Sequence, residues 1–133
     1  MLHIEHIGIA VAQLEESIPL FSSLLNTECY KTEEVASEGV NTAFFKKGTT
    51  KIELLEAKHE ESPIARFLKK NGPGMHHIAF EVADIEAEMS RLANEGFILL
   101  NEQPKKGADN KRVCFLHPKS TNGVLIELCA EIK

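Results

Sequence analysis

Cysteine is scarce in this sequence, and long apolar or basic stretches are missing. The chain has three cysteines, Cys29, Cys114 and Cys129, and none belongs to a Cys-x-x-Cys pair. Because three cysteines cannot all pair internally, a disulfide framework is not expected. Cys114 and Cys129 stand inside apolar runs, which predicts that they are small buried hydrophobic residues.

The charge and hydropathy of the chain argue against two further classes of protein. The net charge is -5, whereas a nucleic-acid-binding protein needs a basic face. No apolar segment is long enough to span a bilayer, and residues 1–6 lack the basic-then-apolar pattern of a secretory signal. We therefore expect a cytoplasmic protein that binds neither nucleic acid nor a membrane.

What the sequence does contain is an internal repeat. His6-Ile-Gly-Ile-Ala-Val11 returns 71 positions later as His77-Ile-Ala-Phe-Glu-Val82, and Lys51-Ile-Glu-Leu-Leu55 returns 74 positions later as Leu125-Ile-Glu-Leu-Cys129. A turn after Phe115 that is longer by three residues explains the change in offset. The 133 residues are therefore interpreted as one domain of two small modules that share a core.

Each module is predicted to follow a β-α-β-β-β order, with the first module over about 1–58, a connector over 59–74 and the second module over 75–133. In the first module we expect a strand over 2–11, an amphipathic helix over 14–25 and strands near 29–35, 41–46 and 51–56. In the second we expect a strand over 76–82, a helix over 85–95 and strands near 97–100, 112–116 and 123–129. Within the connector, Ser62-Pro63 predicts the start of a short helix.

The repeat also duplicates polar residues. His6 and His77 hold equivalent places in the first strands, and Glu53 and Glu127 hold equivalent places in the last strands. Packing accounts for repeated apolar residues but gives no reason to repeat His and Glu. Glu127 lies in an apolar run, where a carboxylate is costly unless it is paired or bound to a metal. Each residue alone is more often structural, but together the four predict two half-sites that close on one divalent ion.

These motifs resemble the vicinal oxygen chelate superfamily, which includes glyoxalase I, extradiol dioxygenases and antibiotic-resistance binding proteins. Within it the chain is similar to the methylmalonyl-CoA epimerase family. The segments that carry the narrower resemblance are Thr50–Leu55, Ser62–Leu68, Gly74–Ala79, Phe115–Lys119 and Gly123–Leu128. The resemblance covers essentially the whole chain. It implies an α+β fold in which two tandem βαβββ modules form a curved, cup-like mixed sheet around a metal site.

The resemblance further implies a metal-dependent epimerase that interconverts (2R)- and (2S)-methylmalonyl-CoA by removing the C2 proton through a metal-stabilised enolate. The family's metal ligands fall on His6, Glu53, His77 and Glu127. The implied ion is cobalt, with manganese, zinc, nickel or magnesium as alternatives. The expected partners are an acyl-CoA substrate and a second copy of the chain in a homodimer.

Epimerisation needs a base on each face of C2. Glu127 can serve as one base, but a family member has its other catalytic glutamate where this sequence has Thr42, and threonine cannot be that base. Either Glu127 works with a water, or Glu38 reaches in from the adjacent turn, or the alignment is shifted. Lys119, Lys111 and Thr42 are the expected substrate contacts, the two lysines because the late loop and strand are basic in an acidic chain.

Two other functions are compatible with the same residues. A glyoxalase I-like lactoylglutathione lyase or isomerase would use the same metal ligands on a thiol adduct, and assays with acyl-CoA and hemithioacetal substrates separate it from the epimerase. A metal-free small-molecule binding protein would not need four ligands. Ligand binding that survives chelation of the metal would favour that third interpretation.

Overall fold

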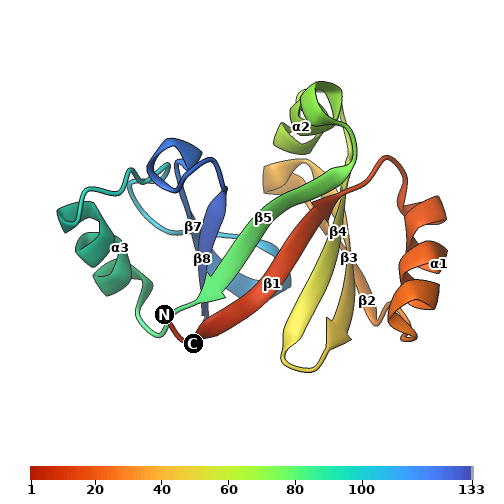
Figure 1. The fold of residues 1–133 in the computed structure, drawn as a ribbon, viewed down its shortest axis with the longest axis horizontal. Coiled ribbons are helices and arrows are strands. Elements are labelled where there is room, and N and C mark those ends of the chain that lie inside the picture. Colours follow the sequence, from red (N-terminus) through yellow and green to blue (C-terminus); the bar gives the residue numbers. More distant parts are fainter. Residues whose placement is uncertain (133) are drawn as a thin grey trace. The chain divides into compact units, whose positions relative to one another are not determined.

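The computed structural model describes residues 1–132 and divides them into two compact units. The N-terminal unit runs from His6 to His76, and the C-terminal unit combines Met1–Glu5 with the chain from His77 onward. Two strands therefore pass from one unit to the other. These are β1 (His3–Ala10) and β5 (Gly74–Glu81), which Figure 1 shows in red and green.

The N-terminal unit has a mixed sheet with the strand order β2-β3-β4-β1. Its remaining elements are α1 (Leu14–Leu25), β2 (Lys31–Val35), the 3-10 turn η1 (Ala36–Glu38), β3 (Val40–Lys47), β4 (Thr50–Ala57) and α2 (Pro63–Asn71). β1 runs parallel to β4, and the pairs β2/β3 and β3/β4 are antiparallel. The first β-α-β-β-β module is therefore confirmed.

The C-terminal unit repeats this plan with the strand order β5-β8-β7-β6. Its remaining elements are α3 (Ile85–Asn94), β6 (Lys105–Lys106), η2 (Ala108–Asn110), β7 (Lys111–Leu116), η3 (Pro118–Ser120) and β8 (Ile126–Glu131). β5 is parallel to β8, and β7 is antiparallel to both β8 and β6. The predicted α+β class with two βαβββ modules is confirmed.

The offsets of the repeat are also present in the structure. β5, α3 and β7 each begin 71 positions after β1, α1 and β3. The longer turn expected after Phe115 contains η3, whereas the N-terminal unit turns tightly at Gly48, which has a positive φ of 62°. An insertion in a surface turn leaves the flanking strands in place.

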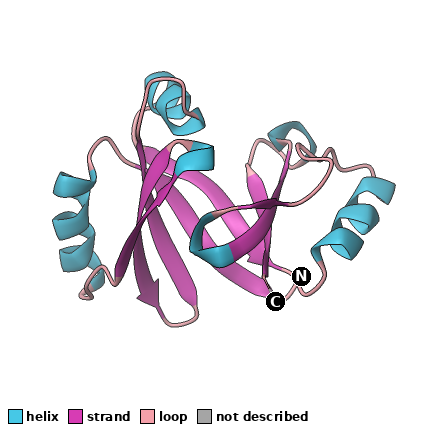
Figure 2. Ribbon diagram, turned by 180° about the vertical axis from the view of Figure 1, so that it is seen from behind, coloured by secondary structure: helices cyan, strands magenta, loops and turns pink. Residues whose placement is uncertain are grey.

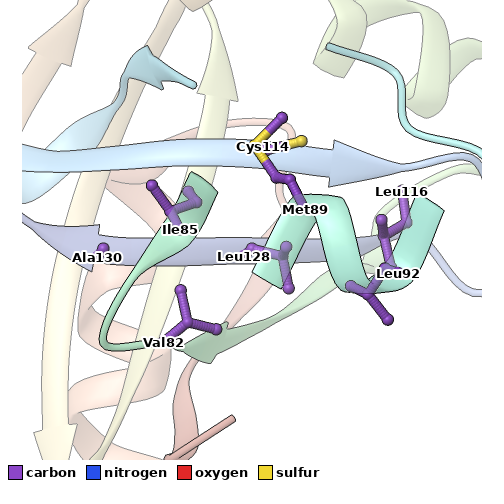
Figure 3. Close-up of a cluster of buried hydrophobic side chains, with 8 residues drawn as sticks. All are labelled: Val82, Ile85, Met89, Leu92, Cys114, Leu116, Leu128 and Ala130. Carbon is purple, nitrogen blue, oxygen red and sulfur yellow. The ribbon is translucent and has the colours of Figure 1, made fainter. Parts of the chain in front are cut away.

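In each unit a helix covers one face of the sheet, as Figure 2 shows with the helices in cyan and the strands in magenta. In the N-terminal unit, the predicted stripe Leu14, Ile18, Phe21 and Leu25 of α1 packs against Ala43, Phe45 and Leu54. In the C-terminal unit, Figure 3 shows Ile85, Met89 and Leu92 of α3 over Cys114, Leu116, Leu128 and Ala130. Side chains of the opposite strand parity lie on the other face of each sheet. Among residues 1–132, no helix is long and apolar enough to cross a membrane.

Two predicted strands differ from the structure. The strand near 97–100 is wrong, because Leu99 forms only an isolated bridge with Leu116, and the regular ladder on that edge of β7 is made by β6 instead. The last strand begins at Ile126 rather than near 123. The chain before it is held in a turn, where the backbone N–H of Gly123 donates to the carbonyl of Pro118 at 2.7 Å.

Ser62 caps α2 as predicted. Its Oγ accepts a hydrogen bond from the backbone N–H of Ala65 at 3.1 Å, and the side chain is buried. Pro63 follows in the first turn, where its missing N–H has no helical partner to lose.

Ser62→Ala is expected to lower the free energy of unfolding by about 1 kcal/mol, because it leaves a helix N–H without its acceptor. Urea denaturation measures the effect. Ser23→Ala, at an exposed position within α1, is the control and should change the free energy by less than about 0.5 kcal/mol. Equal effects for the two variants would contradict a capping role.

Candidate functional site

His6 and Glu53 form a buried pair in the N-terminal unit, on the face of the sheet opposite α1. The Nδ1 atom of His6 lies 3.1 Å from Oε2 of Glu53, and both side chains are at least nine-tenths buried. Gly8 is the β1 partner of Glu53 in the parallel ladder. Since glycine has no side chain, this partner adds no bulk beside the carboxylate.

The C-terminal unit contains the equivalent pair. The Nε2 atom of His77 lies 3.1 Å from Oε1 of Glu127, again with both side chains buried. Ala79 is the β5 partner of Glu127 and takes the place of Gly8. The repeat therefore extends from the backbone to a His, a small residue and a Glu that share one face of each sheet.

The chemistry of each pair fits half of a divalent-cation site. Two ligand atoms about 2.1 Å from an ion, at neighbouring octahedral positions, lie about 3 Å apart, close to the separation found in both pairs. A buried carboxylate is costly unless a hydrogen bond, an opposite charge or a metal compensates it. His6, His77 and Glu127 each offer an atom of a kind that such ions accept.

Each candidate carboxylate also faces a phenylalanine on the neighbouring strand, which the sequence analysis did not assign to the site. Phe44 of β3 is the register partner of Glu53, and Phe115 of β7 is the register partner of Glu127. The signal in the sequence was the repeat itself, since these two phenylalanines are 71 positions apart.

Thr42 and Glu38 both belong to the N-terminal unit. Thr42 lies in β3 two residues before Phe44, so it shares the face that carries Glu53. Its side chain is buried, and Oγ1 has no hydrogen-bond partner among residues 1–132. Glu38 is the last residue of η1, and its Oε1 atom is buried. The Thr42 hydroxyl and the Oε1 atom of Glu38 are therefore shielded from bulk solvent.

The two candidate lysines lie in different environments. Lys111 is buried, and its Nζ lies 3.3 Å from a carboxylate oxygen of Glu81 and 3.7 Å from one of Glu131. Lys119 is exposed on η3, where its backbone N–H donates to Nδ1 of His117 at 3.0 Å. The ammonium of Lys111 therefore already forms two ion pairs, whereas Lys119 lies on the surface.

The cysteines are free thiols, and the predicted burial of Cys114 and Cys129 is confirmed. Burial raises the pKa of the Cys114 thiol. The pKa of Cys129 is raised by burial first and by the negative charge of Glu127 second. Cys29 is only partly buried, and its thiol donates to the carbonyl of Lys31.

Comparison with known proteins identifies relatives over nearly the full length of the chain. The sequence profile of the glyoxalase/bleomycin resistance protein/dioxygenase superfamily matches residues 5–115. The chain is 43% identical over 127 residues to the ethylmalonyl-CoA/methylmalonyl-CoA epimerase of Cereibacter sphaeroides, covering 94% of this chain and 95% of the relative. It is 42% identical over 126 residues to the mitochondrial methylmalonyl-CoA epimerase of Dictyostelium discoideum, covering 94% and 76%.

A solved structure shows the same fold. It is a variant of Streptomyces coelicolor methylmalonyl-CoA epimerase in complex with 2-nitronate-propionyl-CoA. The two structures superpose with a TM-score of 0.94 at 35% sequence identity, covering 98% of this chain and 95% of the other.

Only Cys29 is expected to react with a disulfide reagent such as DTNB in the native protein at pH 8, because the thiolate is the reactive form and burial disfavours it at Cys114 and Cys129. Counting the released thiolate with and without denaturant measures this. A Cys29→Ser variant should give almost no native reaction. Rapid native labelling of that variant would contradict the buried positions.

Proposed function

The chain belongs to the glyoxalase/bleomycin resistance protein/dioxygenase superfamily, and we propose that it interconverts (2R)- and (2S)-methylmalonyl-CoA with the help of a divalent metal ion. Its relatives over almost the whole chain include several methylmalonyl-CoA epimerases, and the enzyme is an epimerase. The observation that carries the metal-dependent chemistry is the buried His–Glu pair, with a nitrogen–oxygen separation of 3.1 Å, that occurs once in each unit.

The proposed ligands are His6, Glu53, His77 and Glu127, two from each repeat. Two imidazoles and two carboxylates suit a borderline ion, for which cobalt(II) is the first candidate and manganese, zinc, nickel and magnesium are the alternatives. When bound, the ion supplies a Lewis acid that polarises the thioester carbonyl and a template for the substrate carboxylate. The supporting observation is that each pair already brings a nitrogen and an oxygen to the spacing of neighbouring ligands.

The residues of the chain would carry out the proton transfer. We assign Glu127 as the base on one face of C2 and Glu38 as the base on the other. One carboxylate takes the C2 proton, and the electron pair of the broken C–H bond delocalises onto the thioester oxygen. The opposite carboxylic acid then gives a proton to the other face of C2, and the configuration is inverted. The buried Oε1 atom of Glu38 supports its assignment, because it is already shielded from bulk solvent.

Thr42 takes a binding role in this proposal. A buried hydroxyl without a partner costs about 1–3 kcal/mol, and the Oγ1 atom of Thr42 is such a group within residues 1–132. A carboxylate or carbonyl oxygen of the substrate would accept its hydrogen bond. Binding of the substrate would therefore remove a cost that the free protein carries.

The anionic parts of coenzyme A need cationic partners. Lys119 is the better placed of the two candidate lysines, because it is exposed on η3. Lys111 could contribute only if its ion pairs with Glu81 and Glu131 were exchanged for contacts with the substrate.

The homodimer and the cytoplasmic location stay predictions.

The proposed reaction is tested by hydrogen exchange in deuterated water. Protein stripped of metal is expected to leave the C2 proton of methylmalonyl-CoA in place. Reloading with cobalt should restore exchange with inversion, because the carboxylates then act on an acidified proton. Proton NMR measures the exchange, and chiral analysis of the methylmalonic acid released from the thioester measures the inversion.

The hemithioacetal of methylglyoxal and glutathione serves as the control substrate and should remain unconverted. Bound cobalt without exchange, together with conversion of the hemithioacetal, would favour a glyoxalase I-like enzyme.

Glu38→Gln separates the two bases. A missing base typically costs about 10²- to 10⁴-fold in rate, so epimerisation should fall by at least about 100-fold. One epimer should still exchange its C2 proton without inversion, because Glu127 remains on its face. The bound metal content should be unchanged, and Glu60→Gln, at an exposed position, is the matched control. If the Glu38→Gln variant epimerises at the wild-type rate, the second proton transfer is instead assigned to Glu127 with a water.

A further inference from the structure

In the C-terminal unit, the ring of Phe115 adjoins both members of the His77–Glu127 pair. The His77 and Phe115 rings have centroids 5.9 Å apart and planes at 82°, a T-shaped contact. This geometry is favoured by the opposite charge distribution at the edge and the face of aromatic rings. Phe115 is also the cross-strand partner of Glu127, and directly opposed side chains on one sheet face lie in contact.

Phe115 is itself held firmly. Its backbone N–H donates to Oδ1 of Asn101 at 2.9 Å, and its carbonyl accepts from the N–H of Leu100 at 2.8 Å. The ammonium of Lys105 lies 5.8 Å from the centroid of its ring, within reach of a cation–π attraction. The backbone of Phe115 is therefore held by hydrogen bonds, and its ring packs against the buried Ala79, Val113 and Cys129.

The N-terminal unit repeats two parts of this arrangement, the ring opposite the carboxylate and the cation over the ring. Phe44 faces Glu53 across the ladder, and the ammonium of Lys31 lies 4.7 Å from the centroid of its ring. Lys31 and Lys105 are 74 positions apart, the same offset as Glu53 and Glu127. A repeat that preserves a ring beside each carboxylate and a cation over each ring exceeds what apolar packing requires.

We infer that Phe115 is a positioning residue of the metal centre, because its ring fixes the orientation of the His77 imidazole. The inference rests on the proposed function only for the role of His77 as a ligand. An imidazole can rotate about its Cβ–Cγ bond, and only a narrow range of rotation directs a nitrogen lone pair at an ion. Outer-shell groups that orient a ligand by hydrogen bonding typically change metal affinity by about 10- to 100-fold when they are removed. The T-shaped contact with Phe115 adds an aromatic restriction on the same imidazole.

Phe115→Leu tests the inference, since leucine keeps an apolar side chain but removes the ring. We expect cobalt affinity to fall about tenfold by titration calorimetry. The visible absorption bands of the bound cobalt should also shift, because the geometry around the ion changes. In the metal-free protein, the NMR shifts of the His77 ring protons should move as the ring current of Phe115 is lost. Phe115→Tyr keeps the ring and should restore all three readouts.

Phe97→Leu is the matched control. Phe97 packs on the helix-covered core of the same unit, so the same change there should leave the affinity, the cobalt bands and the His77 shifts as in the wild type. Thermal unfolding verifies that the variants are folded, and Phe115→Met replaces Phe115→Leu if that variant does not fold. Wild-type affinity and unchanged His77 shifts in the folded ring-less variant would overturn the inference.

These readouts are independent of catalysis. A wild-type protein that binds cobalt through His77 but does not exchange the C2 proton would refute the proposed reaction and still show the loss of affinity in Phe115→Leu. A wild-type protein that binds no divalent ion would overturn the positioning role itself.

Discussion

The burial of a carboxylate beside an imidazole, repeated once in each unit, is the constraint on which the rest of the structure depends. Glu53 and Glu127 are themselves buried and lie between apolar residues in the last strands, where an uncompensated charge would be costly. His6 and His77 lie at 3.1 Å from them and provide the compensation. The same burial makes both pairs poor candidates for surface ion pairs and good candidates for ligands.

The rest of each unit serves to place its pair. α1 and α3 cover one face of each sheet with apolar residues, so the His and Glu of opposite parity lie on the other face. Gly8 and Ala79 are the register partners of the carboxylates on one neighbouring strand. Phe44 and Phe115 are their register partners on the strand at the other side. Three consecutive positions across the sheet therefore follow one pattern of small residue, carboxylate and aromatic ring.

The two units differ in the groups that surround their buried pairs. The first pair presents Nδ1 of its imidazole to the carboxylate and the second presents Nε2. Thr42 contributes a buried hydroxyl on the face of the N-terminal sheet that carries Glu53. The C-terminal unit has Lys111 and its two ion pairs on the equivalent face. A duplicated scaffold can thus keep a buried His–Glu pair in each unit while the side chains around each pair diverge.

The sequence by itself determined the repeated βαβββ order, the helix stripes, the Ser62 cap and the four candidate ligands, because each rests on local periodicity or on a residue repeated at a constant offset. Its prediction of a strand near 97–100 was wrong, since pairing along an edge depends on which distant segment competes for β7, and Lys105–Lys106 takes that place. Only the tertiary structure decided that Lys111 is engaged by Glu81 and Glu131, and that Phe115 packs on His77. These contacts join residues that are far apart along the chain, and no local pattern encodes the distance between two side chains on different strands.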